Sequence, residues 1–197
     1  MKRGIVVPTI IFTIAFLFLV SCSKKQEEQS KERQQPSLTQ GTMESNSTAG
    51  IHWSVSKRWI AQPLRTMRVA TYAAPAAEGD AEGGECAVFY FGNNQGGNID
   101  ANIDRWAAQF ENAGKPSRSS REVNGLKVTL VQISGTYLAP SGPMMQSQGK
   151  KENYRLLGAI VEAPEGLVFF KYTGPTKTIA ATETEFNDLV DSMKKQE

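Results

Sequence analysis

The pattern of hydrophobic and polar residues divides the chain into three segments. Residues 1–21 hold a short basic start followed by a nearly continuous apolar run. Residues 22–50 contain no aromatic side chain and almost no aliphatic one, and such a composition cannot bury enough apolar surface to offset the entropy of ordering. Residues 51–197 carry the short alternating and helical patterns of a folded domain. We therefore expect an N-terminal export segment, a disordered tether and a single domain.

The first part of the domain predicts three strands. Trp53 and Trp59 lie in a segment that is expected to form a first strand, followed by a loop at Pro63. Residues 67–74 alternate between two faces, as a strand does, and stop before Pro75, which disfavours helix in the residue that precedes it. Residues 87–91 are continuously apolar and aromatic, as in a central strand covered on both faces.

An amphipathic helix follows these strands. Apolar residues recur at spacings of four, three and four positions, which places them on one face of a helix: Ile99, Ile103, Trp106 and Phe110. Asn98 is the expected N-cap, because its side chain can accept a hydrogen bond from the first helical turn.

The second half predicts two hairpins and a helix. Asn124-Gly125 separates residues 119–123 from residues 126–134, and Asn-Gly readily adopts the positive φ angles of a type I′ turn. Residues 135–153 are rich in glycine, proline and serine and are expected to form a long loop. A second hairpin is expected from residues 154–162 and 167–172. The final helix, with Thr176 or Thr178 as a possible cap, has one apolar face: Ile179, Phe186, Leu189, Val190 and Met193.

Helices that each bury one stripe against a sheet give an α+β fold. We expect a mostly antiparallel sheet of about six to seven strands with two main helices packed on it. Short motifs through the domain carry a family likeness: the Trp53 segment, residues 67–70, residues 89–92 continuing through Asn102, Arg105, Trp106, Gln109 and Phe110, and a closing helix with Phe186.

With these residues the chain resembles the PsbP-like α/β/α sandwich family. Residues 153–175 also resemble the tail of uncharacterised bacterial exported proteins. The resemblance implies a non-catalytic extracytoplasmic accessory or assembly module, and it supplies no catalytic residue.

The N-terminus has the layout of an export signal. Lys2 and Arg3 precede the apolar run, and residues 19–22 read Leu-Val-Ser-Cys, which resembles the bacterial lipobox. On this interpretation the signal is removed and Cys22 becomes the lipidated first residue. Ser23, where an aspartate would favour retention in the inner membrane, favours the outer membrane facing the periplasm. The alternative is an uncleaved anchor, because the apolar run exceeds the length of a usual secretory signal core, about 7–15 residues.

The distribution of charge argues against one class of partner, nucleic acid. Lys2 and Arg3 account for the whole formal net charge of +2, so the remaining acidic and basic residues balance. Nucleic-acid binding favours clustered lysine and arginine. We therefore expect no nucleic-acid partner, and contact with the membrane through the lipid anchor alone.

Two irregular segments are the candidate ligand or partner surface. The first is the turn of Asn93, Asn94, Gln95, Gly96 and Gly97, whose backbone N–H groups could face an anion at a helix start. It lacks the Gly-Lys-Ser/Thr ending of a P-loop, and a tight turn between strand and helix is the simpler interpretation. The second segment carries three contact candidates: Tyr137, Met144 and Met145. Methionine pairs adapt to apolar partners.

Residues for catalysis or metal binding are sparse. His52 is the single histidine, which leaves no multi-histidine metal site. Cys86 begins an apolar strand and is expected to be buried. Asp100, Asp104 and Glu111 are expected on a solvated helix face. We therefore expect no enzyme, no cofactor and no metal.

The preferred hypothesis is a lipid-anchored binding or assembly module with an unknown envelope protein as its partner. The alternative is a small-molecule carrier or enzyme with a pocket between sheet and helix. A cavity lined by convergent polar groups would favour this alternative.

The anchor can be tested directly. Radioactive palmitate should label the wild-type protein and should not label Cys22→Ala, because the lipid is attached at this cysteine. Absence of label in the wild type, or equal label in both proteins, would contradict the lipobox interpretation.

Overall fold

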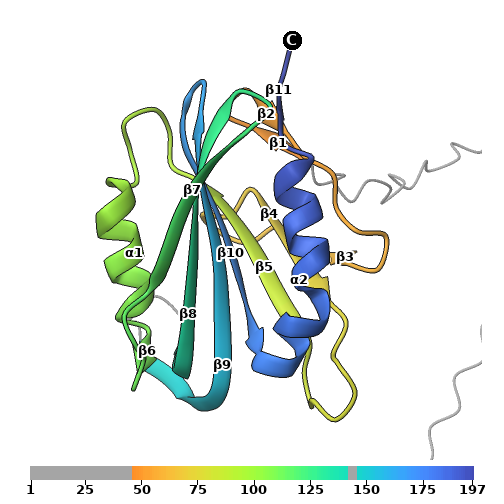
Figure 1. The fold of residues 1–197 in the computed structure, drawn as a ribbon, viewed down its shortest axis with the longest axis vertical. Helices are drawn as coiled ribbons and strands as arrows, with labels where there is room; N and C mark the ends of the chain where they lie inside the picture. The colour runs from red at the N-terminus through yellow and green to blue at the C-terminus, as the bar shows by residue number, and fades with distance from the viewer. Residues whose placement is uncertain (1–45, 142–145) are drawn as a thin grey trace, which may run out of the picture. The chain divides into compact units, whose positions relative to one another are not determined.

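The computed structural model describes residues 46–141 and 146–197 (Figure 1). The predicted signal segment, Cys22, most of the predicted tether, Met144 and Met145 lie outside these residues. The described elements are, in order: β1 Ser47–Thr48, β2 Ile51–His52, β3 Ile60–Ala61, β4 Ala70–Ala74, β5 Gly84–Tyr90, α1 Ile99–Ala107, β6 Phe110–Glu111, β7 Ser117–Val123, β8 Leu126–Ser141, β9 Gln146–Ala163, β10 Gly166–Pro175, α2 Thr176–Asp191 and β11 Lys194–Lys195.

The strands form two antiparallel sheets. The larger one has eight strands in the order β3-β4-β5-β10-β9-β8-β6, with β7 also paired to β8. The smaller one has the order β1-β2-β11. Because two helices pack on a mostly antiparallel sheet, the predicted α+β class is confirmed.

The larger sheet has a core on each face, and strand β10 shows the alternation that produces them. Val168, Phe170 and Tyr172 belong to the core that includes the buried residues of α2. Phe169 belongs to the core that includes Ile103 and Trp106 of α1. Successive side chains of a strand point to opposite faces, so α1 and α2 cover opposite sides of one sheet, as Figure 1 shows.

Helix α1 is shorter than its apolar stripe indicated. It ends at Ala107, and Phe110 lies in β6, where it pairs with Tyr137. Phe110 is buried in the same core as the apolar face of α1. Its position therefore matches the helical spacing although the residue lies in a strand. The predicted N-cap is present: the Asn98 side chain accepts a hydrogen bond from the backbone N–H of Ala101 at 2.8 Å.

The predicted loop of residues 135–153 is wrong. Most of these residues extend β8 and β9, which pair from Lys127–Glu162 to Ser141–Gln146. Register shifts fall between Gly135 and Tyr137 and between Leu138 and Pro140. Such irregularities let a strand accept residues that fit poorly in a regular ladder, proline among them. The local composition therefore predicted a break that long-range pairing overrides.

The domain also begins before residue 51. Ser47–Thr48 pairs with Ile51–His52, and Ala49 between them is buried. The predicted tether therefore overlaps the fold at its C-terminal end. The reason is again long-range pairing, because β2 also pairs with the C-terminal strand β11.

Helix α2 receives its N-terminal hydrogen bond from another segment. Pro175 occupies the cap position and makes no side-chain cap, which differs from the prediction of Thr176 or Thr178. Instead, Oδ2 of Asp80 accepts hydrogen bonds from the Thr178 backbone N–H at 2.9 Å and from its hydroxyl at 2.7 Å. A carboxylate at this place also interacts favourably with the helix dipole.

The seat of α1 on the sheet can be tested at Gly158. A Cβ atom at this position would lie 2.3 Å from Cζ3 of Trp106, so Gly158→Ala should force α1 away from β9. Overpacking of this kind typically costs about 1–3 kcal/mol, which urea unfolding would measure. Gly114→Ala is the matched control, because nothing lies within 4 Å of its added Cβ. Equal stability of the two variants would contradict this role of Gly158.

Candidate functional site

The α1 face of the sheet is only partly covered, and a pocket lies beside the helix. Trp106 packs on Gly158 of β9, whereas β10 and β5 come next in the sheet order. Above these two strands lies a pocket of about 460 Å³, enclosed by α1, β8 and the loop before β4. We call it the α1-face pocket. A nine-residue helix is too short to cover all strands of this face.

Aromatic side chains form the apolar part of the pocket. Phe89, Phe91, Trp106 and Phe169 line it. The ring centroids of Phe89 and Phe91 are 6.1 Å apart, and those of Phe91 and Phe169 are 6.0 Å apart. Ligand pockets are typically apolar and aromatic with a few precisely placed polar groups. This wall therefore has the composition expected for contact with a small organic molecule.

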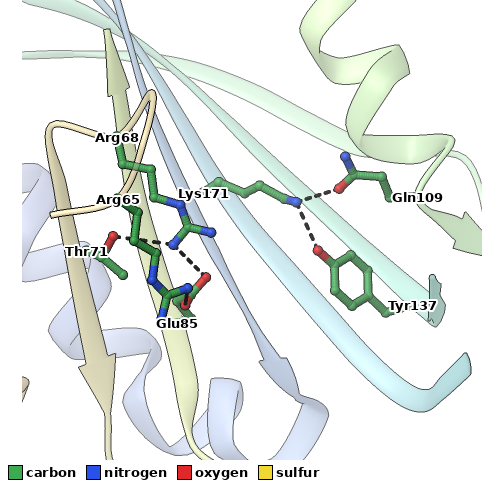
Figure 2. Close-up of polar contacts among 7 residues, drawn as sticks. All are labelled: Arg65, Arg68, Thr71, Glu85, Gln109, Tyr137 and Lys171. Carbon is green, nitrogen blue, oxygen red and sulfur yellow. Dashed lines mark hydrogen bonds and ion pairs between the residues drawn. The ribbon is translucent and has the colours of Figure 1, made fainter. Parts of the chain in front are cut away.

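Lys171 is the central polar group of the pocket (Figure 2). Its ammonium donates hydrogen bonds to Oε1 of Gln109 at 2.5 Å and to the hydroxyl of Tyr137 at 3.2 Å. Its Nζ also lies 5.2 Å from the centroid of the Tyr137 ring. Within residues 46–141 and 146–197, no carboxylate forms an ion pair with Lys171. The ammonium is thus held by neutral partners alone.

The surroundings of Lys171 disfavour its charge. Burial is the main cause that lowers its pKa to about 8, and Arg68 lowers it further while Glu85 opposes the shift. Burial also raises the pKa of Tyr137 to about 12, so that its hydroxyl stays protonated at neutral pH. An ammonium that is partly stripped of water and lacks a counter-ion favours an anion brought in from outside.

Arg68 and Glu85 line the other side of the pocket, and Arg65, outside the lining, also binds Glu85. Glu85 accepts from Nη1 of Arg68 at 2.8 Å and from Nη1 of Arg65 at 3.0 Å. Arg68 also donates to the Thr71 hydroxyl at 3.3 Å and lies 5.7 Å from the Phe89 ring centroid. Figure 2 shows this group beside Lys171. Because Glu85 is shared between two guanidinium groups, it does not neutralise this side.

Arg105 adds a further cation from α1. It lines the pocket, and its Nη1 donates to Oδ1 of Asn102 at 2.9 Å. No ion pair with a carboxylate is found for it among the described residues. The pocket lining therefore holds three cationic side chains and one carboxylate: Arg68, Arg105, Lys171 and Glu85.

The predicted glycine-rich turn does not line the α1-face pocket, although it packs against lining residues. Gln95 donates its backbone N–H to the Gly92 carbonyl, and the Asn102 side chain donates to the Gly96 carbonyl at 2.9 Å. Asn94 has a positive φ of 57°. A Cβ at Gly96 would lie 2.6 Å from the Phe91 ring. Close packing on Phe91 therefore explains the glycine at position 96.

The exposed side of this turn borders a separate shallow hollow. Asn94, Gln95 and Gly97 line it together with residues 162–163 and 166–167. Asn93 is exposed beside them. A partner or ligand role for these residues stays a prediction.

Of the predicted contact residues that the structure describes, Tyr137 lines the pocket. It was expected in an exposed loop, but it lies in β8 and is 8% exposed. Its hydroxyl faces Lys171 (Figure 2). The structure thus separates Tyr137 from the turn of residues 93–97, which does not line the α1-face pocket.

Lys171 and Glu85 were missed as site residues in the sequence. One signal was present, because Lys171 is a lone lysine inside the apolar run of residues 167–172. A lysine inside a buried strand needs a polar partner or an opening. The partners Gln109 and Tyr137 come from distant segments, which no local pattern reveals.

Cys86 lies outside the pocket. It is fully buried in the α2-side core, as predicted, and burial raises the pKa of its thiol well above the usual range. Within the described residues, no group of three or more histidine, cysteine, aspartate or glutamate side chains is arranged to hold a metal ion. No helix among them is both long enough and apolar enough to cross a bilayer.

Comparison with known proteins yields similar structures. No family model and no curated protein match the sequence. The solution structure of the cyanobacterial PsbP, CyanoP, from Synechocystis sp. PCC 6803 is similar, with 9% identity, 81% of this chain and 98% of that chain covered, and a TM-score of 0.47. PA94 from Pseudomonas aeruginosa, a protein of unknown function, is similar with 10% identity, coverage of 68% and 95%, and a TM-score of 0.44. At these identities the likeness concerns the fold and assigns no site residue.

The burial of Lys171 predicts a pH effect on stability. Its pKa is about 8 in the folded protein against an ordinary value of 10.5, so between these pH values the unfolded chain binds more protons than the folded one. Stability contributed at this site therefore rises with pH across that window. Lys171→Met lacks this titration. Urea unfolding should show the free energy of unfolding of the wild type increasing relative to the variant from about pH 8 to pH 10.5.

Lys127→Met is the matched control, because Lys127 is exposed on β8. It should show no comparable change relative to the wild type. A difference between wild type and Lys171→Met that is constant with pH would contradict the assigned burial.

Proposed function

We propose that this protein is a small-molecule binding module of the bacterial cell envelope, and that the α1-face pocket is its binding site. The observation that carries the proposal is a pocket between sheet and helix in which polar groups converge beside an aromatic wall. This is the property that favours a carrier over a flat assembly surface. The lipobox-like residues 19–22 support attachment to the outer membrane through Cys22.

The polar groups of the pocket fit binding better than catalysis. Nucleophilic catalysis commonly pairs the nucleophile with an adjacent histidine or carboxylate that acts as general base. Lys171 contacts the neutral groups of Gln109 and Tyr137, while Glu85 is engaged by two arginines. We therefore propose a non-catalytic role.

A protein partner is the second candidate, favoured by one observation. Three large apolar side chains in and after β3 are exposed: Ile60 at 68%, Leu64 at 55% and Met67 at 68%. Met67 also lines the α1-face pocket. A partner bound here would contact the same side of the domain that opens to the ligand, and an envelope protein that receives or delivers the ligand fits this arrangement.

The binding function can be tested by filling the pocket. Ala87 is buried, lines the pocket and pairs directly with Lys171 across β5 and β10. Ala87→Phe should occupy the space of the ligand. Wild-type protein purified from its host, denatured and extracted should release a small molecule in an amount comparable to the protein, as measured by mass spectrometry. Ala87→Phe should release much less.

Ser119→Phe is the matched control, because Ser119 is exposed on β7 and lies outside the pocket lining. It should release as much as the wild type, and melting curves should show that both variants are folded. A wild type that releases nothing, or an Ala87→Phe variant that releases as much as the wild type, would contradict the proposal.

A further inference from the structure

Resting on the proposed binding function, we propose that the ligand of the α1-face pocket is an amphipathic carboxylate. Its carboxylate would be held by Lys171, and its apolar body would lie along Phe89, Phe91 and Phe169. The inference follows from the hydrogen bonds, the charges and the shape of the pocket.

The hydrogen bonds leave room for one acceptor at Lys171. An ammonium has three N–H donors. Two of them are engaged with Gln109 and Tyr137, and the structure gives the third no acceptor in residues 46–141 and 146–197. A carboxylate oxygen would supply this acceptor together with the missing negative charge, and charge-assisted hydrogen bonds of this kind are the strong ones.

The charges of the pocket favour an anion over a neutral ligand or a cation. Three cationic side chains and one carboxylate line it, and that carboxylate is shared with Arg65. A cationic ligand would meet Glu85 only after displacing an arginine. An anion meets Lys171 without breaking an ion pair.

The same geometry favours a carboxylate over a phosphate. Phosphate recognition commonly uses the two-pronged hydrogen bonding of free guanidinium groups. Here Nη1 of Arg68 is engaged by Glu85 and Thr71, whereas Arg105 gives one N–H, on Nη1, to the neutral Asn102 amide. The preference for one negative charge therefore rests on Lys171, and decyl phosphate tests whether Arg105 contributes a second cation. Lys171 is a point charge with neutral hydrogen-bond partners, which matches one negative charge.

The wall of the pocket accounts for the apolar part of the ligand. Phe89 and Phe91 are only half-buried although they are large aromatic residues, and Met67 at the opening is 68% exposed. Covering such surface is favourable because it removes apolar area from water. An alkyl or aryl body of moderate length would obtain this gain, whereas a small acid such as acetate would not.

The proposal is tested with four probes that separate head from body: decanoate, decanol, decyl phosphate and acetate. Each is titrated calorimetrically into the full chain in lipid nanodiscs, with empty nanodiscs as the partition blank. Decanoate should bind at least about tenfold more tightly than decanol, as expected for a hydrogen-bonded charge pair. It should also bind more tightly than decyl phosphate and acetate.

Variants assign the selectivity to Lys171. Lys171→Met should reduce decanoate affinity by at least about tenfold and leave decanol affinity nearly unchanged. Lys127→Met, which removes an exposed lysine on β8, should behave like the wild type. Ala87→Phe should weaken both decanoate and decanol, because it removes the space that they share.

Each contrary result has a defined meaning. If decanol binds as tightly as decanoate, and Ala87→Phe weakens both, then the pocket binds small molecules and the carboxylate assignment is overturned. Tighter binding of decyl phosphate overturns it as well. If no probe binds in a manner sensitive to Ala87→Phe, the inference falls, while the extraction experiment decides the proposed function separately.

Discussion

The contact between Trp106 and Gly158 determines how one face of the sheet is divided. The missing side chain at Gly158 lets the indole of Trp106 lie directly on β9, and this contact fixes α1 at one side of the sheet. Helix α2, at 16 residues, packs on the other face, whereas α1 has nine residues. The unequal lengths leave β10 and β5 only partly covered on the α1 face. The pocket is a direct consequence of where a short helix is placed.

The two faces of strand β10 differ because the helix on one side covers the sheet more completely than the helix on the other. The β10 residues Val168, Phe170 and Tyr172 complete a closed core on the α2 side. On the opposite side, Lys171 takes a place that a closed core would give to an apolar residue. A lysine there costs stability, because burial disfavours its charge. Costs of this kind are typical of binding sites, where a group is arranged for a ligand and not for the fold.

The sequence predicted local features well, because they depend on neighbouring residues. The Asn98 cap, the Asn124-Gly125 turn and the apolar face of α2 all follow from side chains a few positions apart. The α+β class follows from their order. The likeness to PsbP-like proteins pointed to the same arrangement, and the structure shows helices on both sides of the sheet.

The predictions failed where distant segments decide the structure. Residues 135–141 look like a loop by composition, yet pairing with β9 and β6 makes most of them strand. The pocket also depends on distant segments: Lys171, Gln109 and Tyr137 meet only after β10, the turn that follows α1, and β8 have been assembled. The sequence therefore offered a pocket between sheet and helix only as an alternative hypothesis, and it gave no sign of which side chains converge there.

The cap of α2 has a consequence for the order of folding. The helix depends for its first-turn hydrogen bond on Asp80, 98 positions before Thr178. Closing so long a loop is entropically costly and slow compared with local helix formation. The first turn of α2 is therefore completed only after the connection between β4 and β5 has reached its final position. Formation of this cap therefore depends on the prior folding of the middle of the chain.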